Sequence, residues 1–569
     1  MESTISRRRF LRASAMTAVG VALSACGATP TPTKVPPTAT KAAAPAAPTA
    51  APTPVPKAAV ELVVSRGQHP SQPILQDAPA HLEVTKVTGV KLNFQVVPDA
   101  DWQSKQTLWM STKQVPDLMY SSFTAMRDYA NPGVFKAVLP LIDKYGPNLK
   151  RYLEAYANDV KRMKFGGDLF IVPATSMRTK RLAPSPCIRK DLLDKVGLPF
   201  PTTFDELYNA LKEIKKANPG TVGWTCRTTS GQSGIKRELM IVAYPFGSGL
   251  GGWARGAHVP YWEPTANGGK GQWLYGPLYP EFKDVLAYFN KLYKEGLLDP
   301  DVANLTPDQW HEKNSSGKGI FSWDNFSFCV RWNQAVRGVD PKATWTPFPI
   351  IKGSKGARQN DYTGFAGSGG GWTIGAGCKY PERAIELMDW MVTPLGVDLR
   401  SWGIQDVHYT LTGKRPDTYT DYSQAGLKKA QEMGERKIKP DIFEKYKTKA
   451  DPFRSYQGDI GVGQLDFAVL WDDWVIYTWD APGEADAWYA MSESDPGLHP
   501  EVMMPAFTAE ETAKLKQIQT DVNAVIDPAI DKVVLGQATM ADWDKAVEAA
   551  KKAGALDWEK IFNEAEARA

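Results

Sequence analysis

Cysteine and histidine are scarce in this chain, and several familiar catalytic motifs are missing. Of 569 residues, five are Cys and six are His. No His-Glu-x-x-His pattern, Gly-x-Ser-x-Gly elbow or Gly-x4-Gly-Lys-Ser/Thr loop is found. After Cys26, four cysteines remain, and their spacing matches no metal-site pattern: Cys187, Cys226, Cys329 and Cys378. These absences argue against zinc hydrolases, serine hydrolases and P-loop nucleotide-binding proteins.

The chain also lacks a strong excess of one charge. Its formal net charge is +4, and residues 1–25 hold four Arg and one Glu, so the remainder carries about +1. This balance gives no reason to expect nucleic acid or an anionic membrane surface as a partner. The whole chain has 43% hydrophobic and 23% charged residues, which is typical of globular proteins, and the part after residue 60 has room for two or three domain-sized units.

No later apolar run is long enough to cross a membrane, but the first 25 residues resemble an export signal. Arg7 and Arg8 precede Phe10 and Leu11, as in Tat signals. The apolar stretch 16–25 is too short to span a bilayer, which needs about 20 residues. Leu23-Ser-Ala-Cys26 resembles the lipobox of bacterial lipoproteins, which predicts a diacylglyceryl group on Cys26. An uncleaved anchor helix is the alternative, and it also places the protein at a membrane, outside the cytoplasm.

Residues 26–59 are rich in Ala, Thr and Pro, and they predict a disordered tether. Extended, such a tract reaches up to ~90 Å, which would hold a domain clear of a cell surface or periplasmic membrane. Because Tat cargo folds in a reducing compartment, we expect buried free thiols rather than disulfides at the four later cysteines.

Strand and helix patterns alternate from residue 60 onward, which predicts an α/β fold with a helical C-terminus. Ligands of parallel sheets bind beyond the carboxyl ends of strands, which singles out residues 66–69 and 120–122. Helices are expected to begin at Thr203, Pro381 and Thr508, the last with a kink at Pro528. The early part of the chain predicts strands at 60–65, 90–97 and 116–122 and helices at 74–88 and 101–112. Further strands are predicted at 168–172, 319–323, 344–350 and 371–374.

Seven blocks, in order, resemble the family 1 extracellular solute-binding proteins of ABC importers, particularly the long lipoproteins that capture oligosaccharides. They include Gly166-Gly-Asp-Leu-Phe-Ile-Val-Pro173, Tyr293-Lys-Glu-Gly-Leu-Leu-Asp-Pro300 and Ser316-Gly-Lys-Gly-Ile-Phe-Ser-Trp323. The others lie at 188–199, 201–207, 371–375 and 402–409. Together the resemblance covers nearly all of residues 60–569.

This resemblance implies a type II-like periplasmic-binding-protein fold, in which hinge strands join two lobes around a central cleft. Carried onto this chain, lobe one is 60–175 plus 372–440, and lobe two is 180–365 plus 450–569. It implies a monomeric receptor, not an enzyme, that closes over a carbohydrate and presents it to an ABC permease. Some relatives carry a calcium loop after the helix that ends here at Ala217. Residues 218–223 offer no carboxylate, so we expect no calcium there, and no cofactor elsewhere.

Nineteen tryptophans suit sugar recognition, because pyranose faces stack on flat rings, although ordinary core packing claims many of them. Trp323 and Asp324 match the family's cleft position, and Trp372 and Trp402 lie near the return to lobe one. Arg66, His69, Tyr120 and Arg178 lie at strand ends or in loops, and the arginines would pair with a ligand's carboxylates. Loop or cluster positions complete the predicted site: Trp253, Arg454 and Trp471. Trp471 and Trp474 would share one helical face, where core packing is the alternative.

Two other classes of protein use similar features. A surface-anchored glycoside hydrolase would place two carboxylates in an aromatic cleft, such as Asp324 with Asp472 or Asp473, about 5 to 9.5 Å apart. A cell-surface adhesion module would keep the tether but present a flat, exposed aromatic patch.

Overall fold

The structure is a computed structural model of the whole chain, in which residues 58–568 are described with several gaps. The gaps are residues 70–71, 178–183, 229–231, 252–257, 326, 358, 362–369, 450, 463–469, 473, 481–483, 496 and 501. Cys26, Arg178 and Trp253 therefore lie outside the described residues, as do the signal and the tether. None of the helices in the described ranges has the length and apolar character needed to cross a bilayer.

Five strands form the first sheet, in the order β3 (Val90–Phe94), β1 (Val60–Ser65), β5 (Leu118–Ser122), β17 (Gly370–Ile374) and β6 (Val172–Pro173). β1 runs parallel to β3 and β5, whereas β17 is antiparallel to β5 and β6. A side chain at Gly371 would place its Cβ 2.2 Å from the carbonyl oxygen of Val172, so only glycine lets β17 pair this closely. The predicted strands at 60–65, 90–97, 116–122 and 371–374 are confirmed within a few residues.

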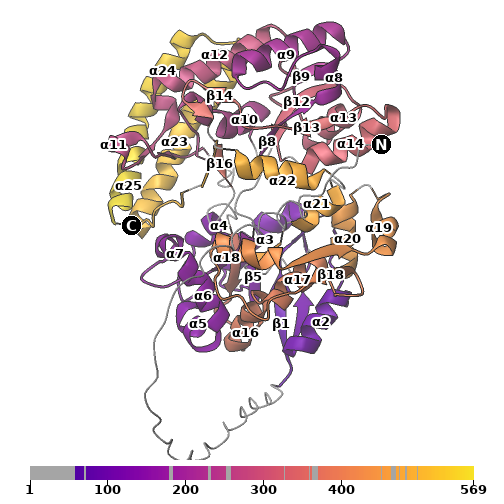
Figure 1. Cartoon of the computed structure of the whole chain (residues 1–569). Coiled ribbons are helices and arrows are strands. Elements are labelled where there is room, and N and C mark those ends of the chain that lie inside the picture. Colours follow the sequence, from indigo (N-terminus) through magenta and orange to yellow (C-terminus); the bar gives the residue numbers. More distant parts are fainter. Residues whose placement is uncertain are drawn as a thin grey trace, which may run out of the picture. The chain divides into compact units, whose positions relative to one another are not determined.

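Helices predicted in this part of the chain are also found. α2 (Pro79–Thr88) begins five residues later than expected, because Pro79 occupies its first turn, and α3 (Asp99–Ser111) follows β4 (Val97–Pro98). α16 (Pro381–Met391) begins at the predicted proline. These helices pack with the first sheet (Figure 1).

Four strands form the second sheet, in the order β13 (Trp345–Pro347), β8 (Ser185–Arg189), β12 (Gly319–Asp324) and β9 (Val222–Trp224). β12 is antiparallel to β8 and parallel to β9. Its helices include α9 (Phe204–Ala217), α12 (Pro280–Lys294), α23 (Ala509–Val534), α24 (Met540–Lys552) and α25 (Ala555–Arg568). In Figure 1 the last three helices, in yellow, lie in the same half as α9 and α12.

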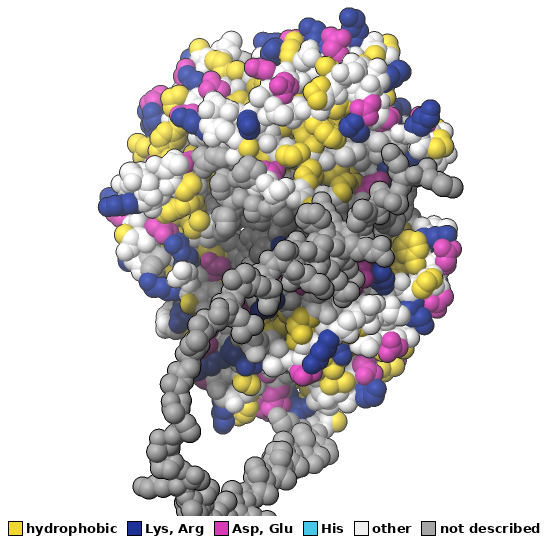
Figure 2. Space-filling view, viewed as in Figure 1, with side chains coloured by type: hydrophobic (Ala, Val, Ile, Leu, Met, Phe, Trp, Pro, Cys, Tyr) yellow, Lys and Arg dark blue, Asp and Glu magenta, His cyan; other side chains and the backbone are white. Residues whose placement is uncertain are grey.

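The two halves have separate hydrophobic cores. The first cluster of buried residues runs from Leu62 to Met503 along the chain, and the second from Ile188 to Ala565. Phe453 and Trp479 belong to the first cluster, although the predicted second lobe includes them. The lobe boundaries themselves stay a prediction. On the face that Figure 2 shows, basic and acidic side chains are interspersed, as the small net charge leads one to expect.

The long C-terminal helix α23 begins as predicted but passes through its proline. Thr508 and Glu511 form the expected capping box. The helix continues past Pro528 to Val534, and its residues at three- and four-residue spacing, including Ile518 and Val522, are buried in the second core.

The expectation of free thiols is wrong for two of the four later cysteines. A disulfide joins Cys187 in β8 to Cys329 in α14 (Ser327–Val339), whereas Cys226 and Cys378 are free and buried. The two bonded residues are 142 positions apart, with Cα atoms 6.7 Å from each other, so their proximity depends on the packing of α14 against the sheet. The disulfide therefore fixes α14 to the second half of the molecule.

Candidate ligand-binding site

Three predicted site residues meet at one edge of the first sheet. Arg66 follows β1, and Tyr120 lies on β5, where it is the register partner of Trp372 on β17. The Cζ atom of Arg66 lies 6.0 Å from the centroid of the Tyr120 ring. Tyr120 is half-buried and contacts Trp372 edge-to-face, with centroids 5.7 Å apart. Residues 66–69 and 120–122 are the segments that the sequence predicts to contact ligand, because ligands of parallel sheets bind beyond the carboxyl ends of the strands.

The backbone after Arg66 packs closely against the start of α3. β2 (Gly67–Gln68) pairs in parallel with β4, directly before Asp99. A Cβ atom on residue 67 would lie 2.2 Å from Oδ1 of Asp99. Glycine at this position therefore lets the carboxylate of Asp99 approach the segment that carries Arg66 and His69.

The carboxylate of Asp451, directly before α20 (Pro452–Ile460), contacts two arginines. Asp451 caps this helix, and its Oδ1 accepts a hydrogen bond of 3.1 Å from the backbone N–H of Arg454. Its Oδ2 lies 3.6 Å from Nε of Arg454 and 3.3 Å from a terminal nitrogen of Arg331 on α14. Phe453, on the same helix as Arg454, packs in the first core, whereas α14 is disulfide-bonded to β8 in the second half. The carboxylate of Asp451 therefore brings side chains of both halves together.

The charges of these groups act on one another. Burial lowers the pKa of Arg454, and the positive charge of Arg331 lowers it further. Burial also lowers the pKa of His69, with the charge of Arg454 as the next cause, so the imidazole is neutral at pH 7. We call Arg66, Asp99, Arg331, Asp451 and Arg454 the arginine cluster.

The arginine cluster continues into the second half through an aromatic ring. The Cζ atoms of Arg331 and Arg227 lie 5.5 and 5.3 Å from the centroid of Phe328. Nε of Arg227 donates to Oδ2 of Asp324 at 2.8 Å, and a terminal nitrogen of Arg237 lies 2.9 Å from Oδ1.

Asp324, predicted to bind ligand, is only 3% exposed and is held by these two arginines. Burial raises its pKa, but the charges of Arg237 and Arg227 outweigh burial and keep the pKa below its ordinary value. In this structure the carboxylate therefore serves the packing of its own half.

Trp323 is also buried, among aromatic rings of the second core. Its ring is 0% exposed and is stacked with Trp224 and Phe204, at centroid distances of 6.3 and 6.2 Å. Trp372 and Trp402 are likewise 0% exposed. None of these three rings offers a free face in this structure, so the predicted stacking platforms occupy packing positions.

The predicted helical face at Trp471 is wrong. Leu470–Trp471 is a short strand, β20, that pairs with β7 (Thr175–Ser176), and helix α21 (Trp474–Asp480) begins only afterwards. Asp472, between them, accepts hydrogen bonds from Nε1 of Trp402 at 3.1 Å and from Nε2 of Gln431 at 2.8 Å. Asp324 and Asp472 are thus both engaged in packing contacts, which does not favour the paired carboxylates of a glycoside hydrolase.

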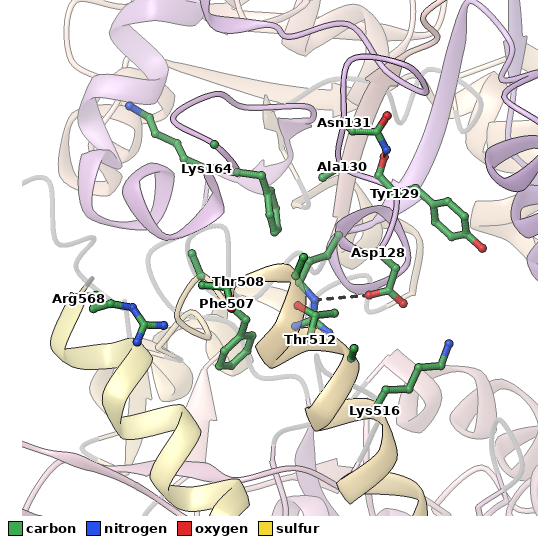
Figure 3. A pocket seen from close by; sticks show the side chains of 16 residues that line it. Asp128, Tyr129, Ala130, Asn131, Lys164, Phe507, Thr508, Thr512, Lys516 and Arg568 are labelled. Atoms are coloured by element: carbon green, nitrogen blue, oxygen red, sulfur yellow. Dashed lines mark hydrogen bonds and ion pairs between the residues drawn. The ribbon is translucent and has the colours of Figure 1, made fainter.

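A cavity of about 810 Å³ lies apart from the arginine cluster, between the first core's residues 127–131 and 164–166 and the C-terminal helices (Figure 3). Its second wall includes Phe507, Thr508, Thr512, Lys516 and Arg568. Arg127 is largely buried, with its Cζ atom 5.5 Å from the ring centroid of Phe507. The volume suits a small-molecule ligand.

Sequence reasoning missed the residues that complete the arginine cluster: Asp99, Arg331 and Asp451. No local motif marks Arg331, whose position depends on the disulfide beside it. Asp451 carried a usable signal, because Asp followed by Pro is a common start of a helix.

The predicted absence of calcium stays a prediction. Oδ1 of Asn218 accepts a hydrogen bond of 2.9 Å from Nζ of Lys195. Within the described ranges, no group of three or more His, Cys, Asp or Glu side chains is arranged to hold a metal ion.

Two α/β halves with separate sheets and cores, linked where β17 returns to the first sheet, define the fold of two-lobed periplasmic solute-binding proteins. A solved structure of similar fold is the alginate-binding protein AlgQ2, solved without calcium ion, with a TM-score of 0.67 and 20% sequence identity. The similarity covers 90% of this chain and 98% of AlgQ2.

The chain belongs to the bacterial extracellular solute-binding protein family, whose model matches residues 72–396, more than half of its length. Lipoprotein LipO of Bacillus subtilis (strain 168) is 24% identical over 303 residues, which are 51% of this chain and 55% of LipO. The fructooligosaccharide ABC transporter substrate-binding protein FusA of Streptococcus pneumoniae serotype 4 is 24% identical over 258 residues, 42% of this chain and 45% of FusA. The chain thus spans about half the length of the curated relatives it matches.

Proposed function

We propose that this protein is the substrate-binding subunit of an ABC importer and that it captures an oligosaccharide between its two halves. The observation that carries the proposal is the family match, taken with the arginine cluster, in which side chains of both halves meet. The likeness to FusA supports an oligosaccharide as the class of ligand.

The proposed site comprises Arg66, His69, Tyr120 and Arg454 from the first half and Arg331 from the second. A ligand that contacts both halves binds the closed form more tightly than the open form, and so it shifts the population towards closure. The permease then recognises the closed form. Trp253, Arg178 and Trp471 remain predicted members of this site.

Purified protein incubated with a panel of oligosaccharides tests this proposal. A receptor is stabilised thermally by its ligand and forms no product, whereas a hydrolase yields shorter sugars. X-ray scattering should show a smaller radius of gyration with the stabilising sugar. Product formation, or stabilisation without compaction, would contradict capture by closure.

We also propose that a lipid on Cys26 anchors the protein on the outer face of the cytoplasmic membrane or at the cell surface. The Tat-like signal, the lipobox and the likeness to a lipoprotein support this location. Cells grown with an azido fatty acid should label the wild-type protein but not Cys26→Ser, which should leave the membrane fraction. Labelling of the variant would refute the anchor.

A further inference from the structure

The arginine cluster carries more positive than negative charge. Arg66, Arg331 and Arg454 contribute three positive charges, Asp99 and Asp451 contribute two negative charges, and His69 is neutral. Among the described residues, the cluster therefore has a net charge of about +1 at pH 7.

The neighbouring group in the second half does not supply the missing negative charge. Arg227 and Arg237 both pair with Asp324. Glu238 lies beside them, but it is fully buried, and burial raises its pKa to about 8. Oε2 of Glu238 also lies 3.8 Å from a terminal nitrogen of Arg237, so the carboxylates of this group are engaged by Arg227 and Arg237.

The hydrogen-bonding capacity of Arg331 is also only partly used. Its contact with Asp451 joins one terminal nitrogen to one oxygen at 3.3 Å, so the pair lacks bidentate geometry. Nε of Arg331 is buried, and it has no hydrogen-bond partner within the part of the chain that the structure describes. A buried donor without an acceptor is costly, and a guanidinium group is suited to a planar anion that accepts two parallel hydrogen bonds.

We propose that the transported sugar is acidic, and that a carboxylate of one of its uronic acid residues binds between Arg331 and Arg454. This inference rests on the proposed function and adds the chemical class of the ligand. One added carboxylate accepts from the donors that Asp451 leaves unused and brings the net charge of the cluster close to zero. A neutral sugar would leave both arginines as they are.

Matched acidic and neutral oligosaccharides test the inference on the full-length protein in detergent. The acidic arm comprises oligogalacturonates, oligomannuronates and glucuronate-substituted xylo-oligosaccharides. The neutral arm comprises the methyl esters of the first two, unsubstituted xylo-oligosaccharides and fructo-oligosaccharides. We expect an acidic member to raise the melting temperature and to bind at least about tenfold more tightly than its neutral counterpart, with an affinity that falls as salt rises.

Three variants then locate the carboxylate. Arg331→Gln and Arg454→Gln should each weaken the acidic sugar by about tenfold or more, whereas Arg331→Lys should retain part of the affinity. The matched control is Arg337→Gln, six residues further along α14, whose guanidinium bonds to Thr344 and Glu484; this variant should leave affinity unchanged. Melting temperatures without sugar show whether each variant folds.

Asp451→Asn separates recognition from a purely structural role. Asparagine caps a helix as well as aspartate does, so α20 should persist. The net charge of the cluster then rises by one, and affinity for the acidic sugar should rise. A fall in affinity would show that Asp451 and Arg331 only hold the halves together, and it would overturn the inference.

The outcomes of the panel are distinct. Binding of a neutral oligosaccharide with no binding of acidic ones would overturn the acidic class and leave the proposed function intact. Stabilisation by no sugar in either arm would count against the proposed function itself, and against this inference with it.

Discussion

Among the described residues, two of the arginine–carboxylate contacts that join the halves differ in how completely their hydrogen bonds are used. Arg162 on α7 (Ala157–Met163) donates from two nitrogens to both oxygens of Glu566 on α25, at 2.6 and 2.5 Å. It also donates to the carbonyl of Met503, and Glu566 accepts from Nε1 of Trp273 at 2.9 Å. In the arginine cluster, by contrast, Asp451 is shared by Arg331 and Arg454 through single, longer contacts.

The difference separates a structural ion pair from the proposed binding site. The Arg162–Glu566 bridge is bidentate and balanced in charge, so a ligand has little to add there. The arginine cluster has spare donors and unbalanced charge, which are the properties that an anionic ligand corrects. We therefore expect substitutions at the Arg162–Glu566 bridge to lower mainly stability, and substitutions in the arginine cluster to lower mainly affinity for the sugar.

Removal of the disulfide should have the largest effect, because it fixes the helix that carries Arg331. Closing a loop of 142 residues stabilises the native state mainly by restricting the unfolded chain. We expect Cys187→Ser with Cys329→Ser to lower the free energy of unfolding by about 3–5 kcal/mol in denaturant titrations, and to weaken sugar binding. Cys226→Ser, at a free thiol, is the control for loss of a buried sulfur. Equal stability of the double variant and wild type would mean that the disulfide does not form.

Arg162→Gln should cost about 2 kcal/mol of stability, because Glu566 loses both of its charged donors. Since the two side chains are about one-fifth exposed, solvent screens part of the interaction. Affinity for the sugar should stay within about twofold of wild type, in contrast to Arg331→Gln. If Arg162→Gln instead lowered affinity and left stability nearly unchanged, the assignment of the bridge to structure and of the arginine cluster to binding would be wrong.

A histidine next to the arginine cluster should make stability depend on pH. Burial and the charge of Arg331 lower the pKa of His311 to about 4, and Nε1 of Trp332 donates to its Nδ1 at 3.2 Å. The folded state thus favours the neutral ring, so its contribution is complete above pH 6.5 and is lost as the pH falls towards 4.

We expect this group to account for about 1–2 kcal/mol of the stability lost between pH 6.5 and 4. His311→Gln retains an acceptor for Trp332 but does not titrate, so urea titrations of this variant should show a shallower loss over that range. A slope identical to that of wild type would assign the pH dependence to other groups.

Arg337→Gln should have the smallest effect. Its ion pair with Glu484 at 3.0 Å is more than one-third exposed on both sides, and such pairs contribute about 0–1 kcal/mol. Thermal melts should therefore place this variant within experimental scatter of wild type. A large drop in melting temperature would show that an ion pair on α14 can stabilise the fold even when it is exposed to solvent.

The sheets could be predicted because their strands have strong local patterns. In β3, buried residues alternate with exposed ones, and Val60–Ser65 is rich in β-branched residues. Once the strand ends were placed, the rule for parallel sheets selected Arg66 and Tyr120 without reference to distant parts of the chain.

The rest of the site depends on contacts between distant residues that no local pattern reveals. Asp451 and Arg331 are 120 positions apart, and their contact requires both the disulfide and the packing of α20. Composition also says nothing of which face of a strand is buried. Trp323 was therefore predicted as a platform, although it lies between Trp224 and Phe204 in the core.

The capping carboxylate of Asp451 has a consequence for the cost of binding. It already accepts a hydrogen bond from Arg454 and contacts Arg331, so an incoming anion would compete with it for the same donors. Part of the attraction between the two guanidinium groups and an anion is therefore offset by Asp451 before binding. An aspartate that starts a helix would in this way moderate the affinity of the proposed site.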